Sequence, residues 1–302
     1  MSVDAALINR PMLEKDVAWA LAHEATAGMR RFVGECAKKD VPFWNGILRN
    51  NTFNAAGNHF KTLNWYRLWE YASCYDFLVK PHPPGAHFLD LGGAGCYFSF
   101  YLAFLGYRVT IVDIDPYMVD VTSAMAKKLG LESRLNCIRR DFIADGGKDL
   151  KIDGAYSISV VEHIPQEGRR AILRQMRQAL PKGGHAFLTF DYGDFVSDYI
   201  DSVHSLADFS ADVETAGFEL DPNRFTPEME DLKVKPYASK FYAVYDDMGS
   251  FAHTDPLADQ LRFVFKSIAL RLGYIQAKDA IKKIIGRKAP DYNFCRLLAK
   301  AV

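Results

Sequence analysis

The chain has 302 residues, of which 49% are hydrophobic, and its 37 acidic side chains balance its 37 basic ones. A net charge of zero gives no support for coating a nucleic acid, because that kind of binding needs a basic surface. Five scattered cysteines without C-x-x-C spacing argue against a disulfide framework or a zinc cluster.

The N-terminal part of the chain predicts helices. Residues 1–80 are rich in aromatic side chains and end at a breaker, Pro81–Gly85. Leu13–Arg31 has the patterning of a helix, and Thr62–Val79 predicts a second helix just before the first strand. Between them, residues 45–58 are rich in Asn and predict a loop. Because neither a signal-peptide pattern nor a run of about 18 apolar residues is present, we expect a cytoplasmic protein.

The segment His87–Asp115 predicts a strand, a glycine-rich turn, a helix and a second strand that ends in an acidic residue. Gly92, Gly93 and Gly95 form the turn, where the lack of a Cβ lets a ligand approach the backbone closely. Asp113 follows the glycines by about 20 positions, where a nucleoside ribose would be held by its hydroxyls. This order places a ligand against a helix N-terminus at the carboxyl ends of parallel strands.

A dinucleotide-binding turn is disfavoured. Its G-x-G-x-x-G fingerprint would need a third glycine at the position of Phe98. An NAD(P)-dependent oxidoreductase is therefore the weaker interpretation of this turn.

Strand and helix patterns alternate over residues 86–220, which predicts an α/β core with a parallel sheet. Pro116–Leu129 and Arg169–Leu180 are the predicted crossover helices, and Tyr292–Ala299 predicts a final strand. We divide the chain into a helical region, 1–80, a core, 81–222, an insertion that would cap a substrate, 223–290, and a final core strand, 291–302.

Five ordered motifs resemble those of the class I S-adenosylmethionine-dependent methyltransferases. LDLGGAG, which contains Asp90, resembles the first motif, and VTIVDIDPYM resembles the second. IRRDF and DGAYSISVVEHIP resemble the segments around the third and fourth strands, and ALPKGGHAFL resembles the turn into the fifth. The resemblance implies a Rossmann-like, seven-stranded, mostly parallel sheet with an antiparallel last strand. A helical N-terminal lid and a C-terminal insertion would complete the fold.

The resemblance also implies S-adenosylmethionine as cofactor and S-adenosylhomocysteine as product. Asp113 would hold the ribose, while Asp141 and Phe142 would read the adenine through a carboxylate and an aromatic ring. The other predicted cofactor-binding residues are Asp90, Gly92, Gly93, Gly95, Ile114 and Ser159. For Asp113 and Asp141, the alternative is a simple capping or turn role.

His163 is the predicted general base, because it follows the fourth strand and its side chain titrates near neutral pH. The alternative is that it serves the loop or the cofactor pocket without touching a proton. Some relatives hold a divalent metal through an E-x-x-E-H arrangement. Here Ser159 replaces the first carboxylate, so we expect no metal site.

Substrate contacts are expected from the N-terminal lid. Tyr66 and Arg67 are candidates for a carboxylate or a charged acceptor, and Trp44 and His59 flank the Asn-rich loop. Core packing is the alternative for such an aromatic stripe.

The C-terminal residues 261–302 contain ten Lys and Arg but two Asp, interleaved with apolar side chains. This pattern suits peripheral contact with an acidic or lipid-linked substrate, and the alternative is a packed helix with a solvated basic face.

We therefore expect an enzyme that methylates a small-molecule or saccharide acceptor on oxygen, without bulk nucleic acid as a partner. An N-methyltransferase and a non-catalytic scaffold or binding protein of the same fold are the alternatives. The sequence leaves homo-oligomerisation open.

Overall fold

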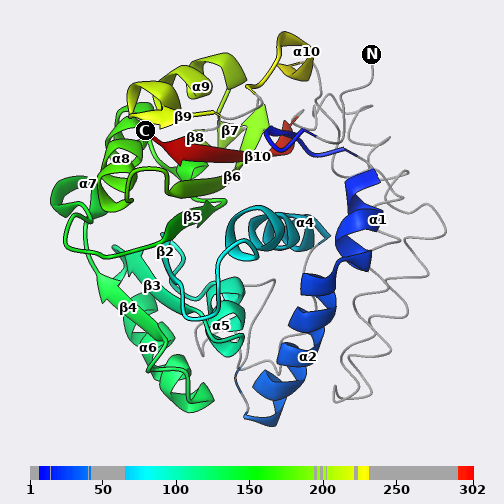
Figure 1. Cartoon of the computed structure of the whole chain (residues 1–302), viewed down its shortest axis with the longest axis vertical. Helices are drawn as coiled ribbons and strands as arrows, with labels where there is room; N and C mark the ends of the chain where they lie inside the picture. Colours follow the sequence, from blue (N-terminus) through cyan, green and yellow to red (C-terminus); the bar gives the residue numbers. More distant parts are fainter. Residues whose placement is uncertain are drawn as a thin grey trace.

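The computed structural model describes residues 7–13, 15–39, 41, 65–193, 196–197, 200–201, 203–220, 224–230 and 292–302. Within these ranges, a mixed sheet of eight strands forms the centre of the molecule, with helices on both faces (Figure 1). Its strands are β1 (Arg10–Pro11), β2 (His87–Leu91), β3 (Arg108–Asp113), β4 (Leu135–Arg139), β5 (Gly154–Ile158), β6 (His185–Gly193), β9 (Phe218–Glu219) and β10 (Tyr292–Ala301). A separate small hairpin pairs β7 (Val196–Ser197) with β8 (Ile200–Asp201).

The strand order is β1-β10-β6-β5-β2-β3-β4, and β9 also pairs with β10. Strands β2 to β6 run parallel, whereas β10 is antiparallel to its neighbours β6, β1 and β9. This topology confirms the predicted Rossmann-like, mostly parallel sheet with an antiparallel last strand. It also brings the carboxyl ends of the parallel strands to one edge, where ligands bind in such folds.

Helices cover the sheet in two layers, each with its own apolar core. One layer contains α1 (Lys15–Ala22), α2 (Glu24–Lys38), α4 (Trp65–Cys74) with its π-helical continuation η1 (Tyr75–Val79), α5 (Tyr97–Phe104) and α6 (Pro116–Leu129). The other contains α7 (Phe142–Asp145), α8 (Gln166–Ala179), α9 (Leu206–Thr215) and α10 (Pro227–Glu230), and a short 3-10 helix, η2 (Val161–His163), follows β5. No described helix is both long and apolar enough to span a bilayer, and all five cysteines are buried as free thiols.

The helix predicted over Leu13–Arg31 is wrong in one respect, because it is interrupted at His23. The His23 ring nitrogen Nδ1 accepts a hydrogen bond from the backbone N–H of Ala25, so this side chain begins α2 as a cap. Apolar periodicity continues across the break, which is why the pattern alone predicted one helix. The second predicted helix, Thr62–Val79, is observed from Trp65 and changes to π-helical geometry at Tyr75.

The N-terminal segment joins the sheet rather than only covering it. Strand β1 pairs Arg10 with Arg296 and Pro11 with Cys295 of β10. Ahead of β1, the Asn9 side chain donates to the carbonyl of Leu298 at 3.0 Å and accepts from its N–H at 2.6 Å. A strand of two residues is too short to show an alternating pattern, so periodicity does not predict it.

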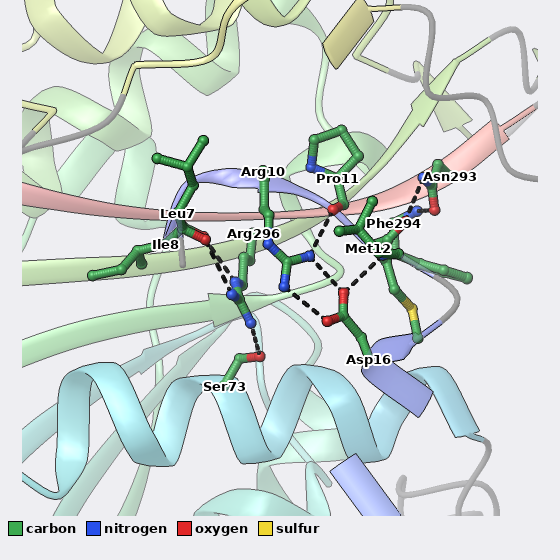
Figure 2. Close-up of polar contacts among 11 residues, drawn as sticks. Leu7, Ile8, Arg10, Pro11, Met12, Asp16, Ser73, Asn293, Phe294 and Arg296 are labelled. Atoms are coloured by element: carbon green, nitrogen blue, oxygen red, sulfur yellow. Dashed lines mark hydrogen bonds and ion pairs between the residues drawn. The ribbon is translucent and has the colours of Figure 1, made fainter. Parts of the chain in front are cut away.

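Two buried arginines anchor this segment (Figure 2). Arg10 donates to both carboxylate oxygens of Asp16, at 2.5 and 2.8 Å.

Arg296 donates to the carbonyls of Ile8 and Leu7 and to Ser73 Oγ of α4. Its guanidinium also lies over three aromatic rings, those of Trp19, Trp69 and Phe77. Burial lowers the pKa of Arg296 to about 9.

Candidate functional site

The glycine turn after β2 is tightly packed. Gly92 and Gly95 have φ values of +71° and +81°, which disfavour any other residue. A Cβ on Gly93 would lie 2.0 Å from a carboxylate oxygen of Asp90, and one on Gly92 would lie 2.6 Å from Val160 Cγ1. These glycines therefore let the turn pass over Asp90 and beside the end of β5.

Asp90 lies beneath this turn and is buried. Its Oδ2 accepts a short hydrogen bond from Ser99 Oγ of α5, which also bonds to the Tyr156 hydroxyl at 2.6 Å. Its Oδ1 has no hydrogen-bond partner among the residues that the structure describes. Burial raises the pKa of Asp90 to about 7, and the charge of Asp113 acts in the same direction.

Asp113 joins the glycine turn to the end of β3. Its Oδ2 accepts a hydrogen bond from the N–H of Ala94 at 3.0 Å, and its Oδ1 accepts from the N–H of Asp115 at 3.0 Å. Asp115 in turn caps α6 by accepting from the N–H groups of Tyr117 and Met118. The predicted ribose ligand thus holds the turn in place from the neighbouring strand, and its side chain remains partly exposed.

Asp141 follows β4 and caps α7, accepting from the N–H groups of Ile143 and Ala144. The ring of Phe142 points away from the solvent, because it packs in the core beside Gly147. The exposed apolar side chain of this turn is Ile143 instead, which is 41% exposed. Here the geometry differs from the expectation that the aromatic ring of Phe142 lies beside an adenine.

Three large apolar side chains are exposed near this edge of the sheet: Ile114 at 69%, Tyr117 at 46% and Ile143 at 41%. Ile114 follows β3 and Ile143 is the second residue of α7, after β4, so they come from the ends of adjacent strands. Exposed apolar groups beside fixed carboxylates suit a flat ring with polar edges. Sequence reasoning named Ile114 but missed Tyr117 and Ile143, whose signal is an apolar residue two positions after a capping aspartate.

A second polar cluster lies at the carboxyl ends of β5 and β6. Glu70 of α4 is fully buried and accepts hydrogen bonds from Ser159 Oγ at 2.5 Å and from Thr189 Oγ1 at 2.9 Å. Arg67, one turn earlier on α4, donates to Glu70 Oε2 at 2.9 Å. The Glu70 carboxylate therefore connects α4 to both strands, and the predicted substrate residue Arg67 forms an ion pair with it.

Ser159 has an unusual backbone conformation. Its φ of +51° is the one positive value among the described residues other than glycine. Its N–H donates to the carbonyl of Thr189 at 3.0 Å, and its hydroxyl donates to Glu70. Left-handed geometry in such a residue costs about 1–3 kcal/mol and is concentrated at functional sites, so Ser159 marks this strand end as one.

Two further carboxylates, Glu162 and Asp191, lie near Glu70. Burial and the charge of Asp191 raise the pKa of Glu162 well above its usual range. Burial and the charge of Glu70 raise the pKa of Asp191 to about 7. Glu162 Oε2 and Asp191 Oδ1 are buried, and neither accepts a hydrogen bond within the described part of the chain. Sequence reasoning missed Asp191, whose signal is an acid inside the apolar strand β6.

The other predicted site residues are placed as follows. His163 ends η2 with an exposed side chain, beside the buried Glu162. Tyr66 lies in α4, but its side chain is not among the described parts. Trp44, His59, the insertion beyond Glu230 and most of the basic residues 261–302 lie outside the described residues. No group of three or more metal-ligating side chains occurs among the residues described.

Comparison with known proteins identifies the domain that carries the glycine turn. Residues 88–184, from β2 to the turn before β6, match a family described as a methyltransferase domain. The match confirms that the glycine turn and the motifs after it resemble a methyltransferase domain. The match includes Asp90, the three glycines, Asp113, Asp141, Ser159 and His163.

The similarity of the chain to curated relatives is partial. The ubiquinone biosynthesis O-methyltransferase of Xanthomonas axonopodis pv. citri (strain 306) is 33% identical over 150 residues, which are 47% of this chain and 56% of the relative. The 24-methylenesterol C-methyltransferase 2 of Oryza sativa subsp. japonica is 34% identical over 84 residues, which are 28% of this chain and 23% of the relative. The chain thus spans 23% to 56% of the length of these two relatives.

A solved structure resembles the chain over most of its length. The [4+2]-cyclase SpnF aligns with 92% of this chain and 94% of its own, with a TM-score of 0.51 and 14% sequence identity. At this identity the likeness concerns the fold alone. Because that protein is described as a cyclase, the fold by itself does not define the reaction.

Proposed function

We propose that this methyltransferase transfers a methyl group from S-adenosylmethionine to a hydroxyl oxygen of a small-molecule or saccharide acceptor. The observation that carries the cofactor assignment is the hydrogen bond by which Asp113 holds the glycine turn through Ala94. This bond brings a ribose-binding carboxylate and a turn without Cβ atoms to one place on the sheet edge.

The residues present fit the cofactor. Asp113 would bind the ribose hydroxyls, and the exposed Ile114 and Ile143 would cover the two faces of the adenine. Asp141 would accept from the exocyclic amine of the adenine with the oxygen that does not cap α7. When bound, the cofactor supplies a methyl group on a sulfonium sulfur, which is activated toward an attacking oxygen.

The protein then has to align the acceptor and take up its proton. Alignment of two bound reactants can contribute about 7–11 kcal/mol, and a general base contributes about 10²–10⁴-fold. We keep His163 as the proposed base, since its side chain is exposed directly after β5. The two named relatives methylate oxygen and carbon, so the family match leaves the acceptor atom to be decided by the base and by the acceptor pocket.

The N-terminal helices would cover the acceptor, with Arg67, Tyr66, Trp44 and His59 as proposed contacts. Arg67 is held by Glu70 at the carboxyl edge of β5, a suitable place to pair with a carboxylate or another negative group. Peripheral contact of the basic residues 261–302 with an acidic or lipid-linked substrate stays a separate prediction. Failure to sediment with anionic vesicles at low salt would contradict it.

Calorimetric titration of S-adenosylhomocysteine tests the proposal. We expect micromolar binding to the wild type, loss of at least about tenfold in affinity for Asp113→Ala, and no binding of NADH. Glu219→Ala is the matched control, because Glu219 is an exposed carboxylate of β9 that pairs with Lys300 of β10. Absence of binding to the folded wild type would reject the methyltransferase proposal and favour a non-catalytic scaffold.

A further inference from the structure

We propose that Asp191, Glu162 and Glu70 form a subsite for a protonated amine of the acceptor, an inference that rests on the proposed function. Such an acceptor carries an ammonium group together with a hydroxyl, as amino alcohols and amino sugars do. The charge of these side chains, their hydrogen-bonding capacity and their position in the fold support this subsite.

The first step concerns charge. When ionised, the three carboxylates carry three negative charges, and Arg67 supplies one positive charge through its ion pair with Glu70. Glu162, which is 1% exposed, lies in η2, which packs against β6, the strand of Asp191. Buried charges that lack partners are unfavourable, so the unliganded protein favours protonation of Glu162 and Asp191. A ligand cation would replace these protons.

The second step concerns hydrogen bonds. Both oxygens of Glu70 already accept from Arg67, Ser159 and Thr189. Glu162 Oε2 and Asp191 Oδ1, by contrast, lack donors within the described residues. An ammonium group has three N–H donors and a positive charge, and therefore meets both requirements. A neutral hydroxyl offers one donor and no charge, and an anion would be repelled.

The third step concerns position and access. Asp191 lies near the carboxyl end of β6, and Glu162 lies in η2, directly after β5. Val160, the residue before η2, packs against the glycine turn at Gly92. The subsite is thus adjacent to the cofactor turn. Asp191, Ser159 and Arg67 are partly exposed, whereas Glu162 and Glu70 are buried, so a ligand would enter beside Asp191.

Substitution by the neutral amide tests the charge argument without an acceptor. The pKa values of Asp191 and Glu162 are higher in the folded protein than in the unfolded chain. Their ionisation therefore reduces the stability of the fold as the pH rises from about 4 through the raised pKa values. Other charged or titratable groups near them are Arg67 and Glu70 of α4 and Cys295 of β10. We expect Asp191→Asn and Glu162→Gln to raise the Tm at pH 8 by about 2 °C or more, and to change it less at pH 4.

The control for these variants is Asp212→Asn. Asp212 is also buried, but it accepts from Arg170 and Gln166 on the opposite layer of helices. Removing its charge breaks an ion pair, so the Tm of this variant should fall. If Asp191→Asn and Glu162→Gln lower the Tm at pH 8 as Asp212→Asn does, their carboxylates have structural partners and the proposal is wrong.

A pair of matched ligands tests the amine. We expect ethanolamine at millimolar concentration to raise the Tm at pH 8 more than ethylene glycol does, both with and without S-adenosylhomocysteine, and this difference to disappear in Asp191→Asn. Equal effects of the two ligands, or a shift with Mg²⁺ and none with ethanolamine, would overturn the proposal. If S-adenosylhomocysteine does not bind but the ethanolamine difference persists, the proposed function fails while the amine subsite stands.

Discussion

The two halves of the sheet edge use carboxylates in opposite ways. In the half formed by β2, β3 and β4, Asp113 and Asp141 accept from backbone N–H groups within their own βα turns or the adjacent one, and both remain accessible to solvent. In the half formed by β5, β6 and β10, Glu70, Glu162 and Asp16 are buried. Side chains bond to them there: Arg10 to Asp16, and Ser159 and Thr189 to Glu70.

This difference separates binding from stability. A surface carboxylate that accepts hydrogen bonds from nearby amides can be removed with a small change in the free energy of unfolding, because water can bond to those amides instead. A buried carboxylate is coupled to the charges around it, so its removal or ionisation changes the free energy of unfolding. We therefore expect substitutions in the first half to alter affinity and substitutions in the second half to alter stability.

The largest expected effect is on the buried ion pair of the second half. Asp16→Ala leaves the guanidinium of Arg10 buried without its bidentate partner, and we expect a loss of about 3–5 kcal/mol in the free energy of unfolding, measured in urea. Glu35→Ala removes the exposed ion pair with Lys38, and this should change the free energy of unfolding by at most about 1 kcal/mol. Equal losses in the two variants would erase the distinction between buried and exposed carboxylates.

The next effect concerns Asp90. It is the buried carboxylate of the first half, and it should behave like the buried carboxylates of the second half. Its folded-state pKa of about 7 lies above the ordinary value of 3.8. Stability should therefore be lost as the pH rises from about 4 to 7, by at most about 1.4 kcal/mol for each pH unit. Asp90→Asn should flatten this part of the stability profile. An unchanged profile would show that Asp90 ionises as in the unfolded chain.

Gly93→Ala tests how tightly the turn is packed against Asp90. The added methyl group would lie 2.0 Å from the carboxylate, so we expect a loss of about 1–3 kcal/mol in the free energy of unfolding. Gly34 lies in α2 with nothing within 4 Å of its added Cβ, and Gly34→Ala should stabilise the protein by about 0.5–1 kcal/mol. A neutral Gly93→Ala would indicate that the turn can move away from Asp90.

The smallest effect is expected at the exposed apolar residues of the first half. The double variant Ile114→Ser and Ile143→Ser should weaken binding of S-adenosylhomocysteine about 5- to 30-fold, since it removes apolar contact of about 1–2 kcal/mol. Its Tm should stay close to that of the wild type, because both side chains are exposed. Val302→Ser, an exposed apolar residue at the chain end, is the control. An unchanged affinity would place the adenine elsewhere.

The first half of the edge was largely predictable from the sequence. Its strands β2 and β3, the glycine turn and helix α6 lie within residues 87–129, and their apolar periodicity, glycines and capping aspartates are local signals. The orientation of Phe142 was not predictable, because whether it or Ile143 faces the core depends on the packing of α7 against α8.

The second half required the tertiary structure. The sequence alone determined that a parallel α/β core would form, since each strand and helix carries its own pattern, and the family resemblance implied the antiparallel last strand. It could not show that β1 places Arg10 beside Arg296 of β10, or that Glu70, Glu162 and Asp191 lie near one another. Those contacts join segments up to 286 positions apart, as in the pairing of Arg10 with Arg296. Strand order and helix packing decide them, and the charges of the isolated residues give no sign of their neighbours.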